Sequence, residues 1–234
     1  MPVDEALILV GGLGTRLRGV VADVPKPLAP IDGRPFLAWV LDRLADAGLR
    51  RVVLAAGYRA DLVEAAIGNR WQGLDIAHVR EPEPLGTGGA VRHALSTLHG
   101  ADGVHVLNGD TYLDYDPFAL EAVTRALGAR IGVALAHMDD VARYGAVRAE
   151  DGRIRGFEEK GGTGEGWINA GAYFLTRAAL DALPSRATFS METDVLLPAA
   201  HAGQLAALTD TDGFIDIGVP EDYARAQLRF GARA

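Results

Sequence analysis

Apolar runs of two kinds alternate along the first half of the chain. Residues 6–10, 51–57 and 103–110 contain short apolar runs, the pattern of strands that are buried on both faces. Between them, residues 35–49 and 61–68 place their apolar side chains at the spacing of one helix face. Strands that alternate with helices predict right-handed βαβ units and a mostly parallel sheet.

Such a sheet gathers the carboxyl ends of its strands along one edge, and ligands bind in the crevice beyond that edge. The three predicted strands lead into residues 11–16, Gly57 and residues 108–110. We therefore expect these segments to share one rim and to contribute to the functional site.

The second half of the chain has a different pattern. Residues 130–138, 145–149, 153–160 and 166–175 are predicted strands in close succession, separated by turn signals such as the Glu-Asp-Gly at 150–152. Their spacing predicts antiparallel strands that extend the first sheet. The expected fold is α/β, a Rossmann-like three-layer α/β/α arrangement with a mostly parallel mixed central sheet.

Composition and charge narrow the function classes. The chain has 234 residues, of which 49% are apolar and 23% charged, as in ordinary globular proteins. A formal net charge of −8 argues against a general nucleic-acid binder, and the absence of cysteine excludes disulfides and thiolate metal sites. The N-terminal residues have neither a basic region nor an apolar run long enough for a signal peptide or a membrane span. We expect a cytoplasmic protein without membrane or nucleic-acid partners.

The loop after the first strand is the first candidate for chemistry. Gly11, Gly12 and Gly14 leave backbone N–H groups free to approach an anion. Arg16 adds a planar donor fork, and Lys26 adds a point charge. The loop lacks the Gly-Lys-Ser/Thr end of a P-loop, and it lacks the third glycine and the acidic residue of a dinucleotide-binding fingerprint. A phosphate cradle remains, with turn glycines beside two solvated cations as the alternative.

Residues 11–37, GGLGTRLRGVVADVPKPLAPIDGRPFL, resemble the characteristic first block of the sugar-phosphate nucleotidyltransferases, also called NDP-sugar pyrophosphorylases. Later blocks follow in that family's order: EPEPLGTGGAV, NGDTYLDYD, RYGAV, FEEK, INAGAYF and FIDIGVPEDY. The resemblance spans residues 7 to 224. It implies one domain over residues 1–234, with residues 1–110 mainly nucleotide-binding and residues 111–234 mainly sugar-phosphate-binding.

The resemblance also implies a reaction in which a nucleoside triphosphate and a sugar 1-phosphate give a nucleotide sugar and pyrophosphate. The attacking phosphate is largely a dianion at neutral pH, so no general base is required. Catalysis then depends on positioning and on electrostatic stabilisation, with Mg²⁺ as the expected cofactor. The family's metal-binding aspartates correspond to Asp110 and Asp216, whose alternative roles are a strand-end turn residue and a helix-entry residue.

The resemblance assigns the remaining site residues block by block. The catalytic residues are Arg16, Lys26 and Asp110. The nucleotide-binding residues are Leu9, Gly11, Gly12, Gly14, Thr15, Arg16, Lys26, Glu81, Gly86, Thr87, Asn108 and Gly109. The sugar-phosphate-binding residues are Tyr144, Gly145, Glu159, Lys160 and Asn169. For Glu158 and Glu159 the alternative is simple strand alternation, with one of the two in solvent.

Within the family, the first two blocks look most like those of guanylyltransferases that act on D-glycero-α-D-manno-heptose 1-phosphate. Guanine presents N–H donors that Glu81, Glu83 or backbone carbonyls would accept. The alternatives are another hexose 1-phosphate with GTP, a uridylyl- or thymidylyltransferase acting on a hexose or amino-sugar 1-phosphate, and a catalytically silent nucleotide-sugar sensor. The helix after Pro220 is expected to pack on the domain or to form the seam of a homodimer.

Overall fold

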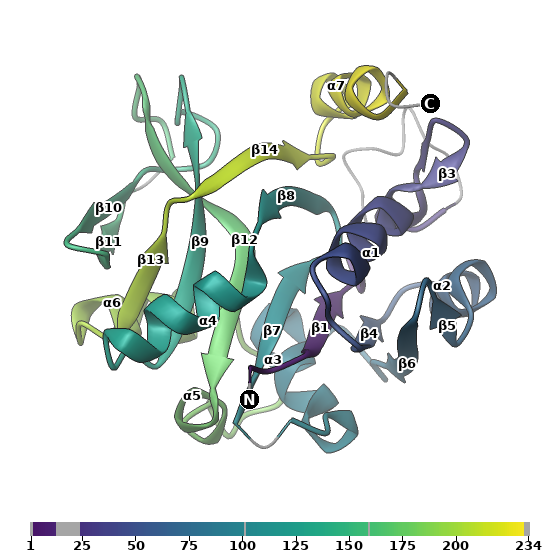
Figure 1. Cartoon of the computed structure of the whole chain (residues 1–234), viewed down its shortest axis with the longest axis horizontal. Helices are drawn as coiled ribbons and strands as arrows, with labels where there is room; N and C mark the ends of the chain where they lie inside the picture. Colours follow the sequence, from purple (N-terminus) through teal and green to yellow (C-terminus); the bar gives the residue numbers. More distant parts are fainter. Residues whose placement is uncertain (1, 13–23, 101, 159, 232–234) are drawn as a thin grey trace.

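The structure is a computed structural model that describes residues 2–12, 24–100, 102–158 and 160–231. The predictions for Gly14, Thr15, Arg16 and Glu159 lie outside the described residues. Secondary structure covers most of the described chain (Figure 1).

The strands are β1 (Glu5–Leu9), β2 (Pro30–Ile31), β3 (Arg34–Pro35), β4 (Arg51–Ala56), β5 (Arg70–Trp71), β6 (Leu74–Arg80), β7 (Gly103–Asn108), β8 (Thr111–Tyr115), β9 (Ile131–Met138), β10 (Val147–Glu150), β11 (Arg153–Phe157), β12 (Gly166–Thr176), β13 (Leu205–Leu208) and β14 (Thr211–Asp216). The helices are α1 (Phe36–Asp46), α2 (Ala60–Ile67), α3 (Gly86–Ala94), α4 (Pro117–Ala126), α5 (Arg177–Asp181), α6 (Leu197–His201) and α7 (Pro220–Gly231). Two 3₁₀ turns, η2 (Lys26–Leu28) and η3 (Leu95–Thr97), and a π-helical turn, η4 (Glu192–Leu196), complete the described elements.

Ten strands form one sheet in the order β10-β11-β13-β9-β12-β7-β1-β4-β6-β5. The pairings give seven strands one direction, and β5, β11 and β12 the opposite direction. The parallel block β7-β1-β4-β6 comes from the first half of the chain, and antiparallel β12 joins it to the strands of the second half. The prediction of a mixed, mostly parallel sheet extended by antiparallel strands is confirmed.

The sheet has a separate apolar core on each face, because successive side chains of a strand point to opposite sides. In β1, Ala6 and Ile8 pack with α1, α2, α4 and α7, whereas Leu7 packs with α3, α5 and α6. In β4, Val52 belongs to the same core as Ala6 and Ile8, and Val53 belongs to the same core as Leu7. The helices that cover the near face in Figure 1 and those behind the sheet thus make the predicted three layers.

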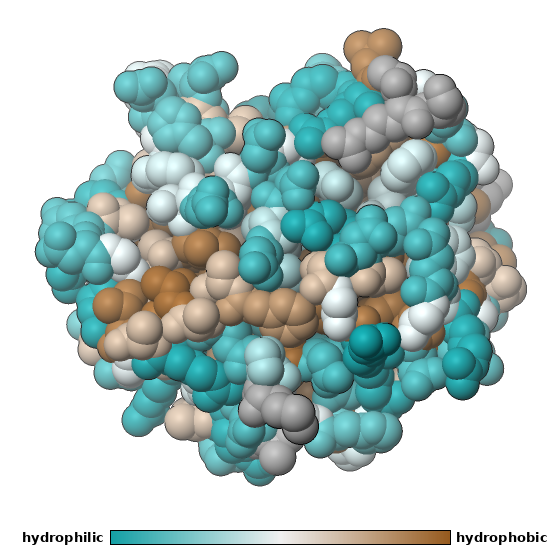
Figure 2. All heavy atoms as spheres, viewed as in Figure 1, coloured by the Kyte–Doolittle hydropathy of each residue, from teal (hydrophilic) through white to brown (hydrophobic). Residues whose placement is uncertain are grey.

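The surface in the same view is largely hydrophilic, with a band of apolar side chains over α4 and the strands beside it (Figure 2). Phe118, Ala119 and Val123 of α4 are partly buried against the core that contains Ala6 and Ile8. The apolar band is therefore the edge of that core. No helix in the described residues is both long enough and apolar enough to span a membrane.

Candidate active site

Two carboxylates and one ammonium group meet where β7 and β14 end. Asp110 follows β7, and antiparallel pairing of β14 with β8 sets Asp216 opposite Thr111. Lys26 Nζ lies 2.6 Å from Asp110 Oδ2 and 3.4 Å from Asp216 Oδ1. The structure thereby brings together three candidate residues from three distant blocks of the sequence.

Among the described side chains the charges of this cluster do not cancel, since one ammonium group faces two carboxylates. Burial raises the pKa of Asp216 above its ordinary value, Lys26 acts against this rise, and Asp110 adds to it. The Lys26 side chain is 13% exposed, against 36% for Asp110, so the pair lies at the floor of an open site. The described part of the chain leaves one negative charge over in this cluster, which favours a further cation here.

A cavity of about 370 Å³, which we call the first cavity, opens at the carboxyl ends of β1 and β7. Its lining residues are Leu9, Gly11, Gly12, Lys26, Pro27, Glu81, Pro84, Gly86, Thr87, Ala90, Asn108 and Asp110. The candidate nucleotide-binding residues among those described all lie here except Gly109. A Cβ on Gly109 would come within 2.7 Å of Val10 Cγ1 and 2.8 Å of Leu9 O, so this glycine lets the loop pack on β1.

Glu81, which directly follows β6, contributes a carboxylate to the first cavity. A Cβ on Gly11 would lie 2.3 Å from Glu81 Oε1, so the glycine leaves room for that carboxylate. Burial raises the pKa of Glu81, and the backbone N–H of Leu85, which donates to Glu81 Oε2 at 3.3 Å, partly opposes the rise. Glu83, the other predicted acceptor, is exposed and does not line the cavity.

The start of α3 is held by a segment from the second half of the chain. The N–H groups of Gly88 and Gly89 donate to Phe189 O at 3.0 and 3.2 Å, and Met191 N donates to Thr87 Oγ1 at 2.9 Å. These helix N–H groups are therefore already satisfied by protein. Of the predicted glycine-rich block, Gly86 and Thr87 face the cavity, whereas Gly88 and Gly89 pack beneath it.

A second cavity of about 570 Å³ lies on the other side of Asn108 and Asp110, which line both cavities. Its lining residues are Asn108, Asp110, Thr111, Tyr144, Gly145, Ala146, Val147, Phe157, Glu158, Lys160, Asn169, Gly171, Tyr173, Glu192, Thr193, Leu196, Leu197, Phe214 and Asp216. The described sugar-phosphate candidates, Tyr144, Gly145, Lys160 and Asn169, all lie here.

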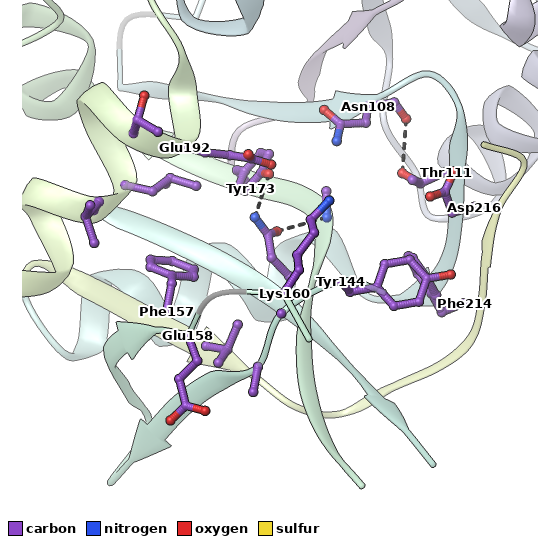
Figure 3. Close-up of a pocket in the computed structure, with 18 of the residues that line it drawn as sticks. Asn108, Thr111, Tyr144, Phe157, Glu158, Lys160, Tyr173, Glu192, Phe214 and Asp216 are labelled. Carbon is purple, nitrogen blue, oxygen red and sulfur yellow. Dashed lines mark hydrogen bonds between the residues drawn. The ribbon is translucent and has the colours of Figure 1, made fainter. Parts of the chain in front are cut away.

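Figure 3 shows how the charged side chains of the second cavity are directed. Lys160 extends across the cavity toward Asn108, whereas the carboxylate of Glu158 points away from it. Glu158 forms an ion pair with Arg148 at 3.4 Å, and its side chain is 53% exposed. Glu159, the residue preferred for the site, lies outside the described residues.

The back wall of the second cavity is formed by an irregular part of β12. The β12–β9 register shifts between Asn169 and Ala172, and Gly171 has φ +73°, which favours glycine. Asn169 Nδ2 donates to the Tyr173 hydroxyl at 3.0 Å, and Asn169 Oδ1 accepts from Gly171 N at 3.0 Å. Protein contacts therefore fix the orientation of the Asn169 amide before any ligand arrives.

Several cavity residues were missed by the sequence analysis. Glu192 and Thr193 come from the π-helical turn η4, and Phe214 comes from β14. The segment SMETDVLLP has the pattern of an ordinary amphipathic helix. The only indication of a site in it was the acid Glu192 next to the hydroxyl of Thr193. Phe214, two residues before Asp216, lay within a block already quoted for its aspartate.

The donor set at the junction of the cavities suits a magnesium ion. Mg²⁺ takes one or two protein carboxylates and completes its shell with phosphate oxygens and water. Asp110 and Asp216 already converge on one cation, the ammonium group of Lys26. Among the described residues, no group of three or more His, Cys, Asp or Glu side chains is arranged to hold a metal. The pair fits an ion that is shared with phosphates.

Comparisons with known proteins agree with one another. A model of the nucleotidyl transferase family matches residues 5–232. The chain is 40% identical to a D-glycero-alpha-D-manno-heptose 1-phosphate guanylyltransferase of Aneurinibacillus thermoaerophilus, over 95% of this chain and 96% of that protein. A protein of the same name from Campylobacter jejuni is 38% identical, over 94% and 96%. The crystal structure of HddC from Yersinia pseudotuberculosis complexed with GMP-PN superposes with a TM-score of 0.84 at 36% identity, covering 98% of this chain and 100% of that one.

Proposed function

This chain belongs to the nucleotidyl transferase family, and on that premise we propose that it transfers a guanylyl group from GTP to D-glycero-α-D-manno-heptose 1-phosphate, forming GDP-heptose and pyrophosphate. The observation that carries the proposal is the pair of cavities with a common wall at Asn108 and Asp110. Two substrates that occupy them meet at that wall, where the attacking and the attacked phosphates must be brought in line.

The work of the protein in this reaction is positioning and charge stabilisation. The sugar phosphate attacks the α-phosphorus of the triphosphate, the new P–O bond forms, and the bond to the leaving pyrophosphate breaks. Lys26, at the wall between the cavities, supplies positive charge beside the reacting phosphates, and Arg16 binds the triphosphate. Asp110 and Asp216 would hold Mg²⁺, which would neutralise phosphate charge.

The first cavity supports guanine as the base. Guanine presents two N–H donors on one edge, and the Glu81 carboxylate in that cavity is an acceptor with two oxygens. Leu9, Gly11, Gly12, Gly86 and Thr87 line the same cavity and contact the nucleotide. The relatives that carry guanylyltransferase names support the same base.

The second cavity supports the sugar phosphate as acceptor. Lys160 reaches across it toward the common wall (Figure 3). We assign to its ammonium group the binding of the acceptor phosphate. Tyr144, Gly145 and Asn169 contact the sugar from two sides. Glu159, next to Lys160 in the sequence, binds a sugar hydroxyl.

The first test is pyrophosphate release with Mg²⁺, crossing GTP, ATP, UTP and dTTP with a panel of sugar 1-phosphates that includes the heptose. We expect turnover to be greatest with GTP and the heptose phosphate. Turnover confined to UTP or dTTP with a hexose or amino-sugar phosphate would reject the proposed substrates, and nucleotide binding without any turnover would favour a sensor.

Lys26→Ala tests the assignment of the charge at the wall. We expect kcat to fall by a factor on the order of 10³, as when a preorganised charge is removed from a transition state. Lys26→Arg is the matched control, because it keeps the charge and changes its geometry. Circular dichroism must show that both variants are folded, and near-normal kcat in folded Lys26→Ala would contradict the role.

A further inference from the structure

Asp222 is a buried carboxylate whose partners include residues beside the second cavity. It lies in the first turn of α7 and is 2% exposed. Its Oδ2 lies 2.7 Å from Arg143 Nη2 and accepts from the Tyr144 hydroxyl at 3.3 Å, and its Oδ1 lies 3.3 Å from Arg225 Nη1. A buried charge is tolerated only when it is paired, and removal of its partners is costly.

Tyr144 is held from three sides, and Asp222 provides the polar contact. The Tyr144 ring meets Phe214 edge-on with centroids 5.6 Å apart, and the Arg143 guanidinium lies over the same ring at 5.1 Å. Figure 3 shows Tyr144 and Phe214 together at one side of the second cavity. Because Asp222 binds both Tyr144 and Arg143, one carboxylate fixes the hydroxyl and the cation that stacks on the ring.

An adjoining face of α7 is fastened to the chain just after Lys26. Gln227 Nε2 donates to Pro30 O at 2.7 Å, and Asp32 N donates to Gln227 Oε1 at 2.9 Å. The Tyr223 hydroxyl also donates to Pro30 O. The helix therefore presents Asp222 from a support that is anchored on the first half of the chain.

The ordinary explanation for an acid at this place is the helix dipole, which favours carboxylates in the first turn. Glu221 fits that explanation, because it lies in the same turn and is exposed. Asp222 differs, since its carboxylate is buried and contacts Tyr144. The two neighbouring acids therefore provide a matched comparison.

We propose that Asp222 is a positioning residue: through Tyr144 and Arg143 it fixes one wall of the second cavity, and so determines affinity for the sugar 1-phosphate. The identity of the ligand rests on the proposed function, whereas the positioning of Tyr144 does not. Asp222 touches neither cavity itself, so it acts only through the residues that it holds.

Asp222→Asn keeps the size of the side chain and removes its charge, and Glu221→Gln makes the same chemical change on the exposed neighbour. We expect Asp222→Asn to raise KM for the sugar 1-phosphate by about tenfold, the value of one charged hydrogen bond, with KM for the nucleotide changed less than twofold. Glu221→Gln is expected to leave both constants as in the unmodified protein. Equal changes in both KM values would overturn the proposal in favour of a general effect on stability.

Tyr144→Phe removes only the hydroxyl, so it tests the same link without disturbing the ion pairs of Asp222. We expect it to raise KM for the sugar 1-phosphate in the same way, and the double variant to show much less than the product of the two effects. Fully multiplicative effects would show that Asp222 does not act through Tyr144.

Hydrogen exchange of the ligand-free protein tests the positioning independently of the reaction. The amides of Tyr144 and Gly145 donate to Val141 O, so their exchange reports on this turn. We expect faster exchange in the peptide covering residues 141–146 in Asp222→Asn and not in Glu221→Gln. Unchanged exchange would overturn the positioning role, whereas faster exchange in a protein that releases no pyrophosphate would support positioning and reject the proposed function.

Discussion

His105 is a buried histidine in the middle of β7. Its Nε2 donates to Val3 O at 3.1 Å, and its ring packs against Phe118 and Phe174. Its Nδ1 has no hydrogen-bond partner among the described residues. Burial lowers the pKa of His105 to about 4, although Glu121, 4.0 Å away, acts in the opposite direction. The folded protein therefore keeps this ring neutral at pH values where an unfolded chain would protonate it.

This pKa difference predicts a loss of stability in acid. Between pH 6.5 and about 4 the unfolded state binds one proton more than the folded state at His105, so the free energy of unfolding falls as pH falls. The contribution of this group is about 1.4 kcal/mol per pH unit. Urea denaturation at pH 7, 6 and 5 measures the slope.

His105→Gln is expected to reduce that slope, because glutamine takes up no proton. The control is His201→Gln, in which an exposed histidine of α6 is replaced in the same way. The same slope in His105→Gln and in His201→Gln would show that His105 does not couple folding to pH.

At the scale of elements, the packing of α3 against residues 187–189 depends on glycines in the helix, whose lack of side chains allows close contact. A Cβ at Gly89 would lie 2.3 Å from Ala187 O, a backbone atom that cannot rotate away. A Cβ at Gly88 would lie 2.3 Å from the ring of Phe189. The close approach lets the N–H groups of α3 reach Phe189 O, which ties the first cavity to the segment leading into η4.

Gly89→Ala therefore tests packing against helix propensity. Alanine is the better helix former by about 1 kcal/mol, yet we expect a net loss of stability of about 1–3 kcal/mol from the forced contact. Gly162→Ala, where no atom of the described residues lies within 4 Å of the new Cβ, is expected to change stability by less than about 0.5 kcal/mol. Chemical denaturation compares the two variants, and a stabilised Gly89→Ala would contradict the packing argument.

The elements differ in how well the sequence predicted them. Periodicity alone predicted β1, α1, β4, β7 and the strands β9 to β12, because each buries side chains at its own period. It did not predict β14, whose partner β8 precedes it by about a hundred residues, or the short hairpin β2–β3. The helix expected to open at Asp61 begins at Ala60, since Arg59 in a left-handed conformation precedes it.

In the candidate site, too, some residues were predicted from the sequence and others were not. Lys26, Asp110 and Asp216 were predicted from separate blocks. The fold brings Asp216 to Asp110 through the pairing of β14 with β8, and it brings Lys26 to both through the turn η2. Asp222 was not predicted as a functional residue, because a carboxylate in the first turn of a helix is already explained by its favourable interaction with the helix dipole. Its contact with Tyr144 depends on a tertiary arrangement that no local pattern records.

At the scale of the whole molecule, the two halves of the chain share one sheet. Strand β12 pairs with β7 over five residue pairs, from Ala172 with Leu107 to Thr176 with Gly103. Helix α7 of the second half also fastens to the first half near Pro30. Without either half, the β7–β12 pairing in the middle of the sheet is lost.

We therefore expect a single cooperative unfolding transition in urea. Trp39 and Trp71 report on the first half, and Trp167 reports on the second. A Trp167→Phe variant and a Trp39→Phe/Trp71→Phe variant separate the two fluorescence signals, and both should give the midpoint found by far-UV circular dichroism. Midpoints that differ between the two variants, while circular dichroism shows both proteins to be equally stable, would reveal independently folding halves.

The position of β12 in the sheet also has a consequence for synthesis of the chain. Strand β7 is complete at Asn108, but its partner β12 ends at Thr176, roughly 70 residues later. At about 5–20 residues per second, the ribosome needs about 3–14 s to supply that partner. During this interval the future centre of the sheet is an open edge that carries Val104, Val106 and Leu107, the kind of surface to which chaperones bind.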